Sequence, residues 1–295
     1  MRFKFSDYNF NFIGRRKIWY IISAAVIIAG IIGFIVSGFN FGIDFLGGSL
    51  MEVQFKREVD ISELRMVMSE AGHPTSIIQR TDARQYIIRT LPVNTEEKNE
   101  ILDELDEQIG INRPILQNRN VLPTFSRHIT RLAMIAVAIS IAGILIYIWI
   151  RFEVRFAVAA IFALIHDVLI TLGFYAIFNR EINITTIAVI LSLLGYSIND
   201  TIVVFDRVRE DTRTMKSLRY EDLVNNSVNK TLARSINTAV TTLFPIIILL
   251  IIGNQTLKDF AFGLMVGIIA GAYSSIFIAS PILVMWNNRF PKYKR

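Results

Sequence analysis

The sequence predicts a polytopic α-helical membrane protein with six transmembrane helices and an inserted α+β domain outside the cytoplasm. Hydrophobic residues make up 53% of the 295 residues and charged residues 19%. In soluble domains roughly 45–50% of the residues are apolar and about 25% are charged. The apolar residues gather in blocks of about 20, the length that a helix needs to cross the ~30 Å hydrocarbon layer. Cysteine is absent, so disulfides, thiolate metal sites and cysteine nucleophiles are excluded.

Six blocks have the length and hydropathy of membrane spans. They are Trp19–Gly38, Ile129–Ile150, Phe156–Phe178, Ile182–Phe205, Ala233–Ile252 and Phe260–Trp286. The first block is longer than the 7–15-residue apolar core of a signal peptide, so we expect it to remain as a span. The predicted organisation is a first segment at 1–38, the inserted domain at 39–128, five further spans at 129–286 with a cytoplasmic loop at 207–230, and a basic tail at 287–295.

The basic residues predict the orientation of these spans. Eighteen Lys and Arg residues lie in the terminal segments and in the connections that follow the second and fourth spans, against Arg180 and Lys258 in the opposite short loops. Because cytoplasmic loops carry the excess of Lys and Arg, both termini are expected in the cytoplasm. The net charge of +6 fits a basic rim facing anionic lipid headgroups and does not require nucleic acid.

Residues 39–128 carry charges of both signs and several prolines, which is typical of a domain outside the bilayer. Alternation and helical periodicity predict the order β-α-β-β-α-β, which is the ferredoxin-like arrangement, with Thr95 capping the second helix. The expected elements are Ser49–Phe55, Ile61–Ala71, Thr75–Arg80, Tyr86–Leu91, Thr95–Ile109 and a weak last strand, Pro114–Asn118. His73 and His128 are far apart in this segment and are expected at its surface, with no metal site.

The segment from Gly42 to Ser49 is rich in glycine and only superficially resembles a phosphate-binding loop. It lacks the Lys-Ser/Thr pair of such loops and lies on the predicted outer face. Gly42, Gly47 and Gly48, together with Asp44, are therefore expected to form a tight turn between the first span and the first strand.

Asp200 is the most informative residue, because it lies about two turns inside the predicted fourth span. A charged Asp at the centre of a membrane helix costs ~2.5–3.5 kcal/mol on insertion scales, and pairing, water or protonation avoids this cost. An incompletely paired buried carboxyl suits a group that loads and releases a proton, although a carboxylate could serve sodium too. The alternative is a structural Asp that locks two helices together. Asp206 is closer to the rim and is expected to pair with Arg207 or Arg209.

The fifth span carries a stripe of polar residues at helical spacing. Its members are Ser227, Thr231, Arg234, Ser235, Thr238, Thr241 and Thr242. Such a stripe either attaches the helix to a neighbour or lines a wet path. The guanidinium of Arg234 requires a carboxylate or water, and Asp200 can lie at a similar depth. Pro245 permits a kink further along the helix.

His166 and Asp167 form a second polar spot, in the third span. A metal site would need further close ligands, and no second histidine or cysteine is near in sequence. The pair is expected to be structural or to join one polar network with Asn199, Thr231, Ser235 and the stripe threonines.

Several of these segments together resemble the bacterial SecD/SecF family of protein-export membrane proteins, on the SecF side. They are Gly42–Gly48, His166-Asp167, Gly195–Glu210 and Thr231–Thr242, and the resemblance extends over nearly the whole chain. It implies a SecD partner that completes a twelve-helix unit, association with the SecYEG channel, and a location in the bacterial inner membrane. It also implies use of the proton-motive force to move preproteins after the SecA ATPase has acted, with Asp200 and Arg234 in the proton pathway, as in the wider resistance-nodulation-division superfamily.

Three other readings stay open. An exporter of small molecules or lipids from the same superfamily usually has twelve spans in one chain. A passive scaffolding subunit would use the polar stripe only to hold helices together. An intramembrane enzyme would need a Ser-Lys, paired-Asp or metal arrangement that the sequence lacks, so we expect no enzyme activity, no cofactor and no bound metal.

Overall fold

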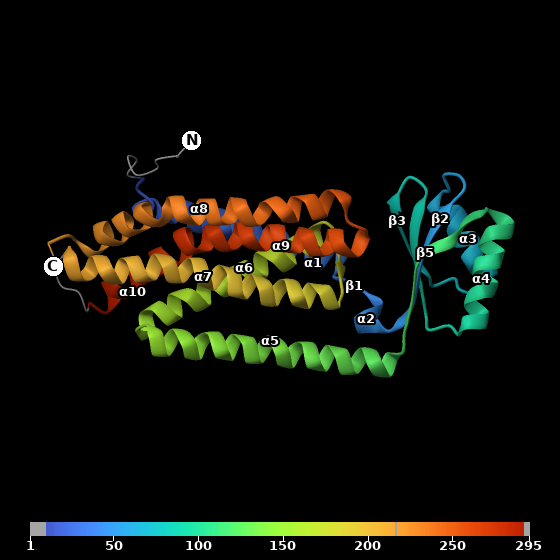
Figure 1. Cartoon of the computed structure of the whole chain (residues 1–295), viewed down its shortest axis with the longest axis horizontal. Coiled ribbons are helices and arrows are strands. Elements are labelled where there is room, and N and C mark those ends of the chain that lie inside the picture. Colours follow the sequence, from blue (N-terminus) through green and yellow to red (C-terminus); the bar gives the residue numbers. More distant parts are fainter. Residues whose placement is uncertain (1–9, 216, 292–295) are drawn as a thin grey trace. The chain divides into compact units, whose positions relative to one another are not determined.

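The computed structural model describes residues 10–215 and 217–291 and divides into two compact units (Figure 1). The helical unit is formed by the chain up to Asn40 and from Ile135 onward, and the inserted unit spans Phe41–Met134. Some basic residues used for the orientation lie outside the described residues: Arg2, Lys4, Lys216, Lys292, Lys294 and Arg295.

Six helical segments are long and apolar enough to cross a membrane, as the sequence predicts. Five are continuous helices: α1 (Arg16–Ser37), α5 (Pro123–Arg151), α6 (Val154–Ile177), α7 (Ile184–Thr214) and α8 (Tyr220–Ile252). The sixth consists of α9 (Gln255–Ser274), a π-helical turn η2 (Ser275–Ala279) and α10 (Ser280–Arg289). Two short strands, β1 (Asn40–Phe41) and β6 (Glu181–Ile182), lie near span ends.

The predicted cytoplasmic loop at 207–230 is wrong in its extent, because most of it is helical. Helix α7 continues to Thr214 and α8 already begins at Tyr220. Glu221 and Asp222 lie in the first turn of α8 and Arg213 in the last turn of α7. These charges stabilise the helix ends on which they lie. Both helices therefore extend into polar sequence, beyond the apolar blocks from which the spans were predicted.

The π-helical turn interrupts the last span where a single helix was predicted. Pro281 follows the turn and has no N–H to donate to the carbonyl four residues earlier. The Ser280 hydroxyl donates to the carbonyl of Ser275, the first residue of the π-helical turn, at 2.9 Å. π-Helical turns within α-helices are frequent at functional sites, and this one lies beside the polar cluster described below.

Helices α6, α7 and α9 form the centre of the helical unit. Helix α9 packs against α6, α7 and α8, and α1 packs against α6. At the α1–α6 crossing, a Cβ atom added to Gly30 would lie 2.7 Å from the Cα of Gly173, so both positions need glycine for the close approach typical of membrane helices.

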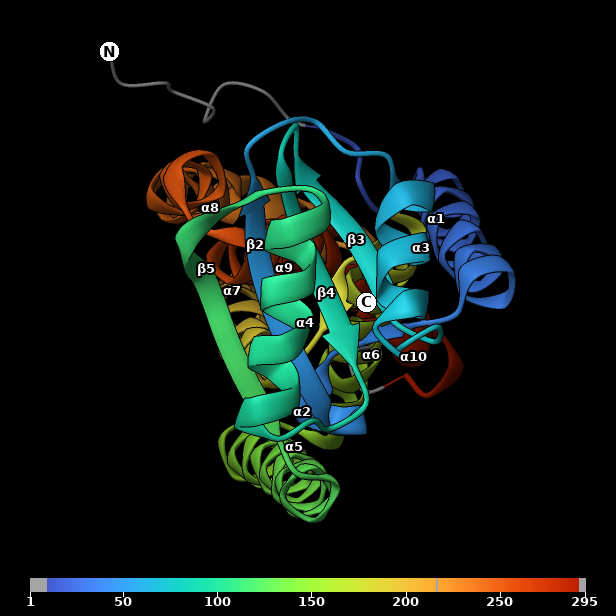
Figure 2. The same ribbon diagram turned by 90° about the vertical axis from the view of Figure 1, so that its right-hand side faces the viewer.

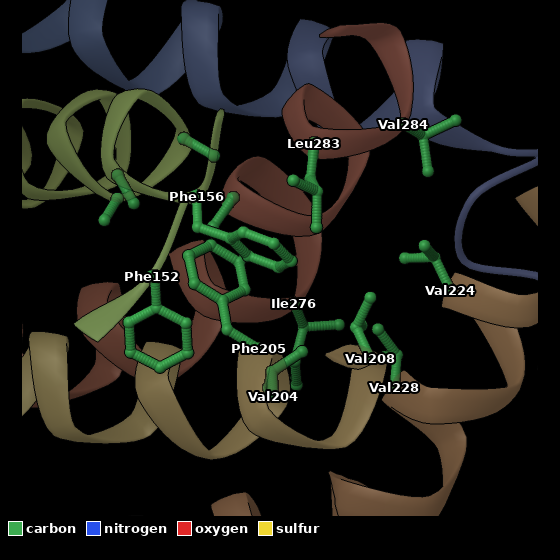
Figure 3. Packing of buried hydrophobic residues seen from close by; sticks show 14 of the residues in the cluster. Phe152, Phe156, Val204, Phe205, Val208, Val224, Val228, Ile276, Leu283 and Val284 are labelled. Carbon is green, nitrogen blue, oxygen red and sulfur yellow. The ribbon is translucent and has the colours of Figure 1, made fainter. Parts of the chain in front are cut away.

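An apolar cluster fills one end of the helical unit (Figure 3). Phe156 and Phe205 meet edge to face with centroids 5.0 Å apart, and Phe152 packs beside both. Other members come from α7, α8, η2 and α10, among them Val204, Val208, Val224, Val228, Ile276, Leu283 and Val284. Aromatic pairs of this kind add about 0.5–1.5 kcal/mol beyond their buried area and hold the ends of α6, α7 and α8 together.

The inserted unit is a four-stranded antiparallel sheet with α3 and α4 on one face (Figure 2). The strand order is β3-β4-β2-β5. The elements are α2 (Ile43–Leu46), β2 (Gly48–Phe55), α3 (Ile61–Glu70), β3 (Ile77–Asp82), β4 (Gln85–Thr90), α4 (Thr95–Gln108) and β5 (Ile111–Val121). Alternate residues of β2 point to the helices, so Met51, Val53 and Phe55 pack against Leu64 and Leu105 in the core.

The inserted unit differs from the prediction in the position of β3, which lies two residues later than expected, and in two further details. Asn94 caps α4 in place of Thr95: its side chain accepts from the Glu97 N–H at 2.8 Å, and the Glu97 carboxylate accepts from the Asn94 N–H at 3.0 Å. This reciprocal pair is a capping box. The last strand also extends over Ile111–Val121, because Pro114 lies in an edge strand, where a missing N–H is tolerated.

Candidate functional site

Asp200 lies on α7, is only 6% exposed, and faces α8. Its Oδ1 atom accepts a hydrogen bond from the Ser235 hydroxyl at 2.7 Å. Its Oδ2 atom is buried and has no hydrogen-bond partner among the described residues. A buried polar atom without a partner costs about 1–3 kcal/mol, and Asp200 Oδ2 is the one carboxylate oxygen among the few such atoms of the described residues.

Arg234 is exposed and forms no salt bridge with Asp200 in the described part of the chain, although its charge acts on the Asp200 carboxyl at longer range. The reason is helical geometry. Successive residues of an α-helix point about 100° apart, so when Ser235 faces Asp200, its neighbour Arg234 turns to the outer face of α8.

The predicted polar stripe on α8 does not form one network. Thr231 is buried, but its hydroxyl donates to carbonyls of its own helix, the nearer being that of Val228 at 3.0 Å. Thr238, Thr241 and Thr242 likewise donate to carbonyls three or four residues earlier. Asn199 is exposed on α7. Ser235 is therefore the member of the stripe that reaches Asp200.

Asp167 forms a second and better satisfied carboxylate centre, on α6. It is fully buried, and its Oδ2 atom accepts from the hydroxyls of Ser197 on α7 (2.5 Å) and Ser274 on α9 (2.8 Å). Its Oδ1 atom lies 2.9 Å from Nδ1 of His166. Nε2 of His166 lies 3.2 Å from the hydroxyl of Ser23 on α1. The Asp167 carboxylate and its partner His166 together thus link residues from four membrane-spanning segments.

The two carboxylate centres meet at the π-helical turn. Ser274 binds Asp167, while its neighbour Ser275 lies 2.8 Å, oxygen to oxygen, from the hydroxyl of Thr201, the residue after Asp200. On α7, Ser197 and Asp200 are three residues apart and therefore on the same face. The sequence indicated that His166 and Asp167 are polar, but the four-helix convergence depends on the packing.

Asp211 and Asp259, at the ends of two membrane-spanning helices, are buried acids that were not singled out from the sequence. Asp211 is 1% exposed at the end of α7, with Lys230 Nζ and Arg207 Nη2 at 3.0 and 3.2 Å. Asp259 is 3% exposed at the start of α9, with Arg180 Nη1 at 3.0 Å. Both acids lie close to the end of an apolar span and have a basic residue within reach. This pattern in the sequence could have indicated that Asp211 and Asp259 are buried in ion pairs.

Asp206 pairs with Arg151 at 3.4 Å, so the predicted pairing with Arg207 or Arg209 is wrong. Residues 206 and 207 point in different directions on α7, and Arg207 instead binds Glu210 and Asp211. Both side chains of the Asp206–Arg151 pair are nearly half exposed.

The glycine-rich segment forms the predicted turn, with a short helix inside it. Gly42 precedes α2, and Gly47 and Gly48 follow it with positive φ angles of 75° and 132°. A Cβ atom on Gly48 would lie 2.5 Å from the Thr90 carbonyl oxygen. Asp44 is buried and forms an ion pair with Arg119 of β5 at 2.6 Å.

Comparison with known proteins places these features in one family. The model of the C-terminal domain of the protein export membrane proteins SecD/SecF matches residues 101–289, and the SecD/SecF GG motif matches residues 32–59, which include Gly47 and Gly48. Protein translocase subunit SecF of Petrotoga mobilis is 40% identical over 288 residues, covering 94% of this chain and 95% of its own. SecF of Calditerrivibrio nitroreducens is 35% identical, with 95% of both chains covered.

Longer relatives and solved structures agree. Protein translocase subunit SecDF of Thermus thermophilus is 37% identical over 96% of this chain, which spans 39% of that protein. The crystal structure of SecDF from Thermus thermophilus, described as a translocon-associated membrane protein, matches with a TM-score of 0.89 at 36% identity over 96% of this chain and 39% of its own. A SecDF structure in a super-membrane-facing form matches with a TM-score of 0.69 at the same identity and coverage. With the GG turn, the six spans and the buried Asp200 in place, the chain belongs to the SecD/SecF family of protein export membrane proteins.

Proposed function

We propose that this chain uses the proton-motive force, together with a SecD partner, to drive or complete preprotein export after SecA has acted. Its role as an auxiliary subunit of the Sec translocase in the bacterial inner membrane follows from the family to which it belongs. The half-satisfied carboxyl of Asp200 is the observation that supports proton coupling.

The physical argument concerns the state of this carboxyl inside a membrane. An ionised Asp at depth costs ~2.5–3.5 kcal/mol, and a unit charge that crosses 100 mV releases about 2.3 kcal/mol. Protonation removes the charge, and the proton can occupy Oδ2, which has no other partner in the described part of the chain. Loading and release of a proton at Asp200 can therefore bias the packing of α7 against α8. The energy involved is similar to the energy that one unit charge releases when it crosses the membrane potential.

The outer face of α8 supports a partner in the membrane. Arg234, Asn237 and Thr241 are exposed in this chain, and so is Asn199 on α7. Polar side chains in membrane helices face a protein interior or a water-filled path rather than lipid. A SecD partner accounts for this surface, and the fusion of both halves in the SecDF relative supports that pairing. In the proposal, Arg234 completes the proton path at this interface, and the unit associates with the SecYEG channel.

The inserted unit is proposed to be a ferredoxin-like domain that meets the preprotein outside the cytoplasm. The order β2-α3-β3-β4-α4-β5 and the sheet order β3-β4-β2-β5 support this fold. The excess of Lys and Arg in the opposite connections supports cytoplasmic termini. An edge strand of such a sheet can receive an extended chain.

The test replaces Asp200 by Asn in the chain assembled with its SecD partner and the channel. Gradient-dependent completion of export is measured in membrane vesicles, with Asp206→Asn as a matched control at the exposed rim of the same helix. We expect D200N to lose the gradient-dependent part of export and D206N to retain it. Unchanged export by an assembled D200N complex would remove Asp200 from the mechanism.

A further inference from the structure

We propose that His166 and Asp167 form a proton-binding site, separate from Asp200, that holds one proton in this conformation. The site lies among α1, α6, α7 and α9, and its polar atoms are connected by hydrogen bonds with assignable directions. Counting the hydrogens along this connection shows how many protons the pair must carry.

The count begins at the carbonyl of Trp19, which can only accept. The Tyr273 hydroxyl lies 2.9 Å from this carbonyl and donates its single hydrogen to it. Tyr273 therefore accepts at its contact with Ser23, whose hydroxyl donates across 3.2 Å. Ser23 has then used its own hydrogen, so the hydrogen between Ser23 and Nε2 of His166, 3.2 Å away, must come from the imidazole.

The other side of the imidazole gives the second hydrogen. Nδ1 of His166 lies 2.9 Å from Oδ1 of Asp167, and two lone pairs at this distance would repel each other, so a hydrogen lies between them. Ser197 and Ser274 supply hydrogens only to Oδ2. The pair thus carries one hydrogen on Nε2 and one between Nδ1 and Oδ1. This is one proton more than a neutral imidazole with a carboxylate would carry, so the pair is neutral overall. It is either an imidazolium with a carboxylate or an imidazole with a carboxylic acid.

The surroundings favour retention of this proton. Asp167 is fully buried and His166 is 7% exposed. His166, Ser23 and Tyr273 border a cavity of about 390 Å³ whose other lining side chains, from α1, α6 and α9, are apolar. A neutral pair costs far less than a lone carboxylate in such an environment.

Few titratable groups face the pair from the helices packed around it. From α9, the Tyr273 ring stacks on His166 at 5.8 Å, and from α7, Asp200 lies one turn beyond Ser197. In the described part of the chain, the Asp167 carboxyl group contacts His166, Ser197 and Ser274, and of these only His166 can carry a charge.

Loss of the proton would change the attachment of α1. A neutral imidazole that keeps its hydrogen on Nδ1 for Asp167 presents a lone pair at Nε2, and Ser23 can then donate either to His166 or to Tyr273, but not to both. One link between α1 and the α6–α9 pair breaks. Occupancy of this site therefore controls how α1 is held, while Asp200 faces α8.

Nitrogen-15 NMR of the imidazole tests the proposal on the full-length chain in lipid nanodiscs at pH 7. The sequence has three histidines, so H73Q with H128Q leaves His166 as the single signal. We expect protons on both ring nitrogens, or a proton on Nε2 together with an infrared band of a carboxylic acid that Asp167→Asn removes. An unprotonated Nε2, or a protonated Nε2 alone without that band, would overturn the proposal.

Two variants make the result specific. Ser197→Ala removes one donor to Oδ2 and should leave the proton count of the imidazole unchanged, while D167N should leave the imidazole with a single proton and no acid band. If D167N does not fold, as judged by circular dichroism, Ser274→Ala serves to assign the acid band through a shift of its frequency. These measurements use no export assay, so failure of the proposed transport role of Asp200 would leave them unaffected.

Discussion

The contact between Asp211 and Lys230 offers a quantitative test of how α7 is held against α8. Asp211 is 1% exposed and accepts from Lys230 Nζ at 3.0 Å, from Arg207 at 3.2 Å and from the Ser227 hydroxyl at 2.8 Å. Lys230 and Ser227 belong to α8, whereas Asp211 and Arg207 belong to α7. Replacing Asp211 by Ala removes the acceptor for both helices and leaves the two cations without their common partner.

The magnitude follows from burial. Breaking a fully buried ion pair costs about 3–5 kcal/mol, but the side chains of Lys230 and Arg207 are 34% and 32% exposed and can turn to water. The loss then approaches that of a hydrogen bond to a charged group, ~1.5–3 kcal/mol. We therefore expect D211A to lower the free energy of unfolding by about 2 kcal/mol, and Asp206→Ala, whose ion pair is nearly half exposed, by about 0–1 kcal/mol.

The assay is reversible unfolding of the full-length chain in mixed micelles, followed by circular dichroism with D206A as the matched control. Lys230→Met should show a loss of similar size, since it removes the partner on α8. Equal stability of D211A and D206A would refute the reasoning, because it would mean that burial of Asp211 does not strengthen its contacts.

Two further predictions concern the proton pathway and the inserted unit. Ser235→Ala removes the hydrogen bond to Asp200 and should reduce gradient-dependent export in vesicles. Thr231→Val should not, because this buried hydroxyl, four residues earlier on α8, bonds only carbonyls of its own helix. Equal export by both variants would contradict the role of Ser235. The hydrogen bond from the Ile111 N–H lowers the pKa of Asp106 below its ordinary value, so its stabilisation is present above the ordinary value and is lost as the pH falls through the lowered one. Asp106→Asn should weaken this acid dependence in thermal unfolding between about pH 5 and pH 2, and an unchanged acid profile would count against the contact.

The spans and most elements of the inserted unit could be predicted because they depend on local pattern. The length of an apolar block predicts a span whatever the neighbouring helices are, and alternation predicts strands such as β2. The errors arose where other interactions extend or end an element. Helix α8 begins in polar sequence at Tyr220, and Asn94 caps α4 through the carboxylate of Glu97.

For the site, the sequence by itself determined that Asp200 and Asp167 lie within membrane-spanning segments, because the apolar residues around them leave no other place. Only the tertiary structure decided which residues face them. The rotation of α8 directs Ser235 to Asp200 and Arg234 away from it, and the convergence of α1, α6, α7 and α9 brings Ser23, Ser197, Ser274 and Tyr273 to the His166–Asp167 pair. The physical reason is that hydropathy reports how deep a residue lies, whereas the direction of a side chain depends on helix rotation, which is set by packing contacts such as that of Gly30 with Gly173.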